Sequence, residues 1–123
     1  MLIDDDLFLR DMYATKFVEM HHMVDTTDLP SIAISKLKKE SYDVVLIDKI
    51  MPEMDGIDLL RKITTEKLGG SPLCIMLTNQ SEWDDFENAK KAGAIGYIVK
   101  AEHIPSTVVT EVERIVNEHK NNI

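Results

Sequence analysis

Cysteine is almost missing from this 123-residue chain, and its single thiol excludes a disulfide bond within the chain. Cys74 lies between the apolar residues Leu73 and Ile75, so we expect a buried side chain rather than a nucleophile. The absence of disulfides fits the reducing environment of the cytoplasm, where we expect the protein to work.

Long apolar runs and an excess of basic residues are missing as well. No segment approaches the about 20 residues that a membrane-spanning helix needs, and no signal-peptide pattern opens the chain. The 14 Lys and Arg residues are outnumbered by 22 Asp and Glu, which gives a net charge of −8. Because nucleic-acid binding usually requires a basic face, we expect neither a membrane nor a nucleic acid as a direct partner.

What the chain does contain is an alternation of strand-like and helix-like segments. Short apolar runs predict strands, and apolar residues spaced three or four apart predict helices. We expect one α/β domain over residues 1–123, with helices on both faces of an open parallel sheet. The expected strands are 1–3, 22–27, 44–47, 73–77 and 95–99, and the expected helices are 7–20, 30–39, 57 to the Gly69–Gly70 pair, 82–92 and a last one around 108–116.

Polar residues follow four of the predicted strands. In an open α/β sheet, ligands bind beyond the carboxyl ends of the strands, so side chains at these ends are expected to converge on one edge. In strand order the residues are Asp4, Asp5 and Asp6, then Asp48, then Thr78 and Asn79, and finally Lys100. At least three carboxylates, one hydroxyl and one amine are therefore predicted to form a site.

The residue types of this site indicate phosphoryl transfer. Crowded carboxylates repel one another, so a hard divalent cation such as Mg²⁺ is needed to keep them ionised. A carboxylate also serves as a nucleophile that forms an aspartyl phosphate. Phosphoryl transfer depends on positioning and charge neutralisation more than on acid–base chemistry, and a metal ion, a lysine and a threonine hydroxyl supply both. The predicted chemistry is acceptance of a phosphoryl group by an aspartate.

With these residues in view, the chain resembles a response-regulator receiver domain of two-component signalling almost end to end. The segments that carry the resemblance are LIDDDLFLR (2–10), VVLIDKIMPEMDG (44–56), IMLTN (75–79) and GYIVK (96–100). The resemblance implies a flavodoxin-like, doubly wound sheet of five parallel strands in the order 2-1-3-4-5. It also implies a Mg²⁺-dependent reaction, with Mn²⁺ as a second option, in which a histidine kinase or phosphotransfer protein donates the phosphoryl group.

The resemblance assigns the metal and acceptor roles residue by residue. Asp48 stands at the position of the phosphoacceptor, and Asp4 and Asp5 stand at the acidic pair. Asp4, Asp5 and Asp48 are expected to form the metal site, with Asp5 favoured over Asp4 as the direct ligand. Ile50, two residues after the acceptor, is expected to offer its backbone carbonyl to the metal.

The same resemblance assigns the residues that respond to the phosphoryl group. Thr78 matches the hydroxyl that turns toward it, Lys100 the lysine that pairs with it, and Tyr97 the aromatic switch. Ile50 and Gln80 lie at the two positions that tune hydrolysis of the acyl phosphate. Because the Ile50 side chain cannot hydrogen-bond an attacking water, we expect slow dephosphorylation.

Three features depart from the family pattern. Ala101 follows Lys100 where proline is usual, so we expect a trans peptide bond there and a small displacement of Lys100. Asn79 stands where a smaller residue is common and is expected to restrict access to Asp48. Only three residues precede Asp4, which makes the first strand short.

Two functions stay open. The favoured one is a signalling switch that catalyses only its own phosphorylation and slow dephosphorylation, and that presents a changed surface of its fourth helix, fifth strand and fifth helix to an unknown target. The alternative is a receiver-like scaffold that binds partners independently of phosphorylation. A flavin-binding module is discounted, because three aspartates after the first strand would repel a cofactor phosphate. The apolar stripe of the last helix is compatible with a homodimer and equally with burial on its own sheet.

Overall fold

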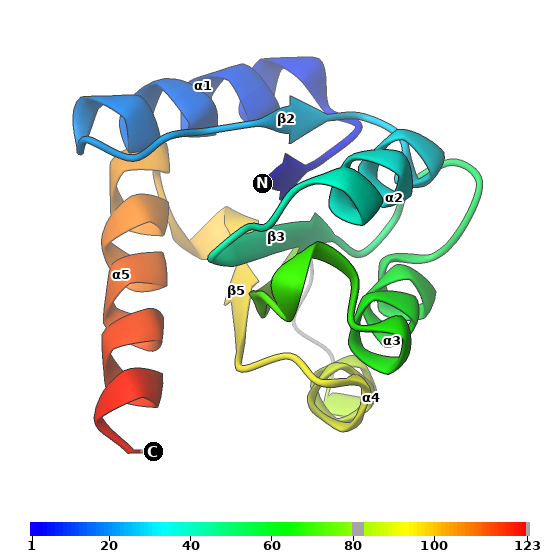
Figure 1. Ribbon diagram of the computed structural model, residues 1–123. Helices are drawn as coiled ribbons and strands as arrows, with labels where there is room; N and C mark the ends of the chain where they lie inside the picture. The colour runs from blue at the N-terminus through cyan, green and yellow to red at the C-terminus, as the bar shows by residue number, and fades with distance from the viewer. Residues whose placement is uncertain (80–82, 123) are drawn as a thin grey trace.

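Five parallel strands, four of them mostly apolar, form one sheet in the computed structural model, which describes residues 1–79 and 83–122 (Figure 1). The strand order is β2-β1-β3-β4-β5, as predicted. The strands are β1 (Leu2–Ile3), β2 (Thr26–Thr27), β3 (Val44–Asp48), β4 (Leu73–Thr78) and β5 (Gly96–Val99). The helices are α1 (Leu7–Glu19), α2 (Pro30–Lys39), α3 (Gly56–Glu66), α4 (Trp83–Ala92) and α5 (Pro105–Asn121).

The sheet separates two apolar cores, because helices cover both of its faces. α1 and α5 lie on one face, and α2, α3 and α4 lie on the other (Figure 1). Successive residues of β3 point to opposite faces, so Leu46 packs toward α1 and α5 while Val45 and Ile47 pack toward α2 and α3. Burial on both faces explains why the strand sequences are continuous apolar runs rather than alternating ones.

The first strand is short, yet it lies inside the sheet. Leu2 and Ile3 pair with β2 on one side and with β3 on the other. The backbone N–H of Asp4 continues this pairing by donating to the Thr27 carbonyl at 3.1 Å. Asp4 is therefore fixed at the carboxyl end of β1, directly beside the end of β3.

Two predicted boundaries are wrong. We expected the Gly69–Gly70 pair to end the third helix, but α3 ends at Glu66 because Lys67 adopts a left-handed conformation with φ of 52°. This turn buries Leu68 between α2 and α3 at the start of a 3₁₀ turn, Leu68–Gly70. The second strand is also shorter than the expected range 22–27. In the described part of the chain, no helix is long and apolar enough to cross a membrane.

Gly56 sets the path of the loop that leaves β3. Its N–H donates to the Lys49 carbonyl at 2.7 Å, and its Cα lies against the chain just after Asp48. A Cβ atom here would overlap the Asp48 carbonyl oxygen and would lie 2.8 Å from the Cα of Lys49. Backbone atoms cannot rotate away as a side chain can, so the site loop requires glycine.

We therefore expect Gly56→Ala to lower the free energy of unfolding by about 2–3 kcal/mol in urea titrations. The matched control is Gly96→Ala, whose new Cβ would meet side-chain rather than backbone atoms, the nearest being a methyl carbon of Ile115 at 2.8 Å. The loss of unfolding free energy for Gly96→Ala should be smaller. A loss for Gly56→Ala equal to or below that of the control would contradict the proposed backbone overlap.

Candidate functional site

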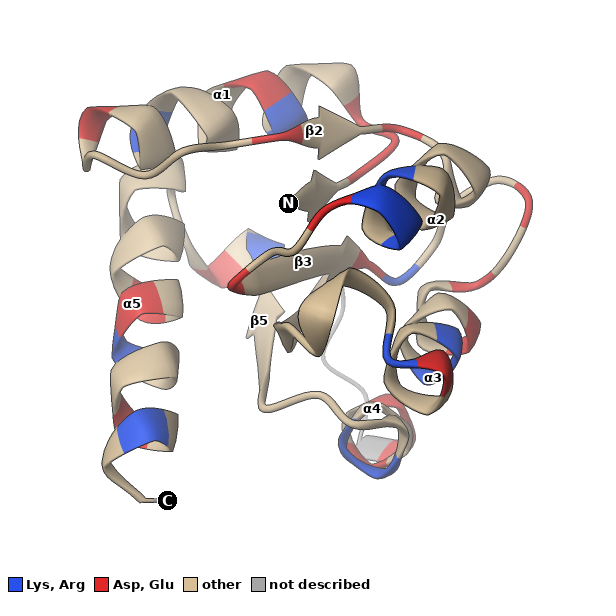
Figure 2. Cartoon of the chain, viewed as in Figure 1, with Lys and Arg blue, Asp and Glu red and all other residues tan. Residues whose placement is uncertain are grey.

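The carboxyl edge of the sheet collects buried polar side chains from four strands. Asp4 follows β1, Asp48 ends β3, Thr78 ends β4 and Lys100 follows β5. All four are buried, and the only other buried polar residue in the described ranges is Thr27. The convergence predicted from the strand ends is therefore present, and the basic and acidic segments that follow β3 and β5 are visible in Figure 2.

A lysine between two carboxylates forms the centre of the site. The Nζ atom of Lys100 donates to Asp4 Oδ2 at 2.7 Å and lies 3.2 Å from Asp48 Oδ1. The exposed fractions of these residues are 0% for Asp4, 5% for Asp48 and 6% for Lys100. The second oxygen of Asp4 accepts from the N–H of Asp6 at 2.9 Å. Asp4 is thus held on both oxygens, whereas Asp48 keeps acceptor capacity for a further group.

Asp5 completes a group of three carboxylates. One oxygen each from Asp4, Asp5 and Asp48 lies within 4.8 Å of the others, and Asp5 is exposed. Only one ammonium, that of Lys100, pairs with this group in the described structure. The residues therefore fit a hard divalent cation, because oxygen ligands and surplus negative charge are what such ions bind. The exposed position of Asp5 leaves this side of the group open to solvent.

Burial makes the charge of Asp48 costly. Loss of hydration is the main cause that raises the pKa of its carboxyl group to about 7. Asp4 and Asp5 also raise this pKa, but the charge and hydrogen bond of Lys100 lower it by more than they raise it. Burial tends to lower the pKa of Lys100, but its pairing with Asp4 and Asp48 raises it overall. Lys100 is thus held in its charged form, and Asp48 is the carboxylate that most needs a nearby cation.

Comparison with known proteins identifies this architecture. The family model described as "Response regulator receiver domain" matches residues 1–112. The chain belongs to this family. Receiver domains are the signalling modules of two-component systems, in which they interact with histidine kinases and downstream targets.

Relatives of this receiver domain differ in length. The chemotaxis protein CheY of Halobacterium salinarum is 31% identical over 108 residues, which is 88% of both chains. The two-component response regulator PhoP of Pseudomonas aeruginosa is 30% identical over 100 residues, 81% of this chain but 44% of PhoP. The chain thus spans less than half the length of PhoP. A receiver domain structure from Methanospirillum hungatei covers 99% of this chain and 95% of its own, at 21% identity and a TM-score of 0.86, which supports the fold.

The residues predicted to respond to the phosphoryl group lie on β4 and β5. Thr78 is buried at the end of β4, between the strands that end at Asp48 and lead to Lys100. Tyr97 is half-buried on β5 and contacts Phe86 of α4 edge-to-face, with ring centroids 5.6 Å apart. The remaining predicted residues are Ile50, which is exposed in the loop after β3; Asn79, which is exposed after β4; and Gln80, which lies outside the described residues.

The departure at Ala101 does not remove Lys100 from the site. All peptide bonds in the described ranges are trans, as we expected for the bond between Lys100 and Ala101. Lys100 begins a 3₁₀ turn, Lys100–Glu102, that is closed by the N–H of His103 donating to its carbonyl at 3.2 Å. Its ammonium still pairs with Asp4 and Asp48.

Two contacts beside the site escape sequence reasoning. Arg10 donates from Nη1 to the Asp4 carbonyl at 2.9 Å, which braces the loop between β1 and α1. Lys49 forms an ion pair with Asp85 in the first turn of α4. The spacing of Arg10 from the N-cap residue Asp6 places Arg10 on the first turn of α1. No local sequence pattern predicts an ion pair between residues 49 and 85.

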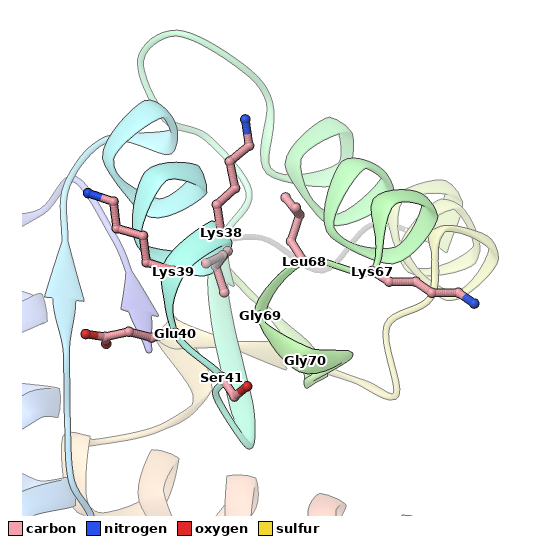
Figure 3. A pocket seen from close by; sticks show the side chains of 9 residues that line it. Lys38, Lys39, Glu40, Ser41, Lys67, Leu68, Gly69 and Gly70 are labelled. Atoms are coloured by element: carbon pink, nitrogen blue, oxygen red, sulfur yellow. The ribbon is translucent and has the colours of Figure 1, made fainter.

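The opposite edge of the sheet holds a separate hollow. A cavity of about 270 Å³ lies between the end of α2 and the 3₁₀ turn Leu68–Gly70 (Figure 3). Its lysines, Lys38, Lys39 and Lys67, point away from one another (Figure 3). They offer no convergent set of binding groups, so this hollow is not a second site of comparable chemistry.

The raised pKa of Asp48 predicts a pH-dependent cost to the metal-free fold. The folded pKa of about 7 exceeds the ordinary value of 3.8, so the unfolded chain loses this proton first. The contribution of Asp48 to stability therefore falls as pH rises from about 4 to about 7. Asn at this position does not titrate, and Asp48→Asn should avoid the loss.

We expect the stability advantage of Asp48→Asn over wild type, in EDTA, to be about 1–2 kcal/mol larger at pH 8 than at pH 5 in urea unfolding. Asp11→Asn, which removes an exposed carboxylate on α1, serves as the matched control and should show no such change. An advantage that stays constant between the two pH values would contradict the raised pKa.

Proposed function

We propose that this receiver domain, over residues 1–123, is a phosphorylation switch in which Asp48 accepts a phosphoryl group from a histidine kinase or phosphotransfer protein. The observation that carries the proposal is the buried Lys100 between Asp4 and Asp48, with Asp5 at the open side. A site with more carboxylate than ammonium charge favours a cation, and a cation favours an incoming phosphate.

The proposed metal ligands are carboxylate and carbonyl oxygens of this chain. Asp5, Asp48 and the backbone carbonyl of Ile50 would hold Mg²⁺, or Mn²⁺, with Asp4 held beside them by Lys100. When bound, the ion neutralises the oxygens of the transferring phosphoryl group. The carboxylate oxygen of Asp48 attacks phosphorus, an O–P bond forms, and the bond from phosphorus to the donor breaks with the electron pair leaving on the donor.

The proposed response uses groups that are already in place. Lys100 would transfer a hydrogen bond from a carboxylate to a phosphoryl oxygen, and the Thr78 hydroxyl would donate to another. Both residues are buried at strand ends, so little side-chain freedom is lost in this step. Ile50 cannot orient a hydrolytic water, so we infer slow dephosphorylation, with Gln80 as the second tuning position. A phosphoryl half-life of seconds would contradict this inference.

A protein donor suits the surroundings of the site. Phe8 at the start of α1, Ile50 in the loop after β3 and Ile104 before α5 are 71%, 70% and 65% exposed. They follow, in sequence, the acidic loop, the acceptor and Lys100. Large apolar side chains on three segments around one site are more typical of a protein-binding surface than of a small-molecule pocket. This favours a histidine kinase or phosphotransfer protein as donor.

We propose that phosphorylation is signalled to a target protein by a change in the surface formed by α4, β5 and α5. Phosphorylation adds negative charge and strong acceptor oxygens at Asp48, and the response of Thr78 would make room for Tyr97 to move inward. The result is a shift between two populations of the surface of α4, β5 and α5, where a target protein or a second copy of the chain would bind. The matched region spans 44% of PhoP. The proposal therefore also covers the case in which this receiver domain controls a longer regulator in the cytoplasm.

The test is intact-mass measurement after incubation with acetyl phosphate and Mg²⁺. We expect one phosphoryl group on the wild type, almost none without Mg²⁺, and none on Asp48→Asn. Asp58→Asn, which removes an exposed carboxylate on α3, is the control and should react like the wild type. No adduct on folded protein, repeated with the smaller donor phosphoramidate in case Asn79 blocks entry, would contradict the switch and favour the phosphorylation-independent scaffold.

A further inference from the structure

Lys49, the residue after Asp48, forms an ion pair with Asp85 in the first turn of α4. Their side chains are only 20% and 16% exposed, whereas those of the surface pair Arg61–Asp58 are 56% and 62% exposed. Exposed ion pairs contribute little to stability, because water and salt screen the attraction between the charges. Partial burial shields the Lys49–Asp85 pair from this screening and strengthens the attraction. The Lys49–Asp85 pair is therefore placed to hold α4 against the segment that carries Asp48.

The next residue of α4 connects the same turn to β5. Phe86 contacts Tyr97 edge-to-face, with an interplanar angle of 67°. Tyr97 in turn packs against the core under α2, α3 and α4. Two consecutive residues, Asp85 and Phe86, thus contact the two places that phosphorylation is proposed to change, which are the segment after Asp48 and the aromatic side chain on β5.

We propose that the Lys49–Asp85 ion pair is a latch that holds α4 in the position found in the unphosphorylated domain. This inference rests on the proposed function. A phosphoryl group on Asp48 places up to about two negative charges next to Lys49 in the chain, and these attract the ammonium away from Asp85. The first turn of α4 then loses its contact with this segment, and Phe86 no longer holds Tyr97 in place.

The latch has a thermodynamic consequence. A contact made only in the unphosphorylated arrangement stabilises that arrangement and opposes phosphorylation by the same free energy. Removing the contact should therefore loosen α4 before any phosphoryl group is added, and it should also speed phosphorylation. These two effects are measured independently of each other.

The first experiment measures hydrogen exchange of the α4 amides in unphosphorylated protein. Asp85→Asn and Lys49→Met should each raise exchange over residues 83–92 about fivefold. The double variant should show less than the sum of the two single effects, because each single variant breaks the same ion pair. The exchanged pair, Lys49→Asp with Asp85→Lys, should restore slow exchange. Lys62→Met, which breaks the exposed pair with Glu66 on α3, is the matched control and should leave α4 unchanged.

The second experiment measures the rate of phosphorylation by acetyl phosphate with Mg²⁺, followed by intact mass. Asp85→Asn should react about fivefold faster than the wild type, since it keeps the lysine beside Asp48 and loses only the latch. If the wild type itself gains no phosphoryl group, the proposed function fails and the latch falls with it. If the wild type reacts but Asp85→Asn reacts at the same rate or more slowly, the latch alone is overturned. Single-variant exchange effects that add in the double variant would overturn it too.

Discussion

The pairing of one buried lysine with two buried carboxylates is the constraint on which the site depends. Lys100 reaches Asp4 and Asp48 because β1 and β3 are neighbours and β5 lies two strands beyond β3. The order of strands along the chain reverses between β1 and β3, and this is where ligands bind in open α/β sheets. Thr78 ends β4, the strand that separates the acceptor from the lysine. The order of the strands thus brings the carboxylates, the ammonium and the hydroxyl to the same edge of the sheet.

Such a site is costly to the fold, since desolvating two carboxylates for one ammonium is seldom recovered in full. The two apolar cores around the sheet offset that cost. Among the described residues, no buried side-chain nitrogen or oxygen lacks a hydrogen-bond partner, so the hydrogen bonds of the polar edge are satisfied. The remaining imbalance is one of charge rather than of hydrogen bonding. A cation bound by Asp5 and Asp48 would relieve it.

The loop after β3 connects this imbalance to the rest of the molecule. At its start, Lys49 pairs with Asp85 of α4. In its middle, the Glu53 carboxylate accepts from the N–H and hydroxyl of Ser31 at 2.8 and 2.9 Å and so caps the first turn of α2. At its end, Gly56 lies against the backbone after Asp48. A change at the acceptor therefore acts on a segment that is held by helices on either side.

Local chemistry makes most of this predictable from the sequence. Strands buried on both faces leave continuous apolar runs, and charged residues at their ends mark the carboxyl edge. The open parallel sheet and the group around Asp48 therefore follow from the pattern, while the strand order follows from the resemblance to receiver domains. Contacts between distant surface positions leave no such pattern, which is why the pairing of Lys49 with Asp85 is not predictable. The end of α3 is not predictable either, because Lys67 adopts a left-handed conformation that glycine usually takes.

The most direct measurement of the central claim is the gain in unfolding free energy that saturating Mg²⁺ confers on the wild type and on Asp5→Asn. A ligand that binds only the folded state stabilises it, so the wild type should gain stability with Mg²⁺. Asp5→Asn removes the exposed member of the carboxylate group without touching the buried Lys100 pairs, and it should lose most of that gain. No gain in the wild type, or an equal gain in both proteins, would contradict a metal-dependent site at Asp5 and Asp48.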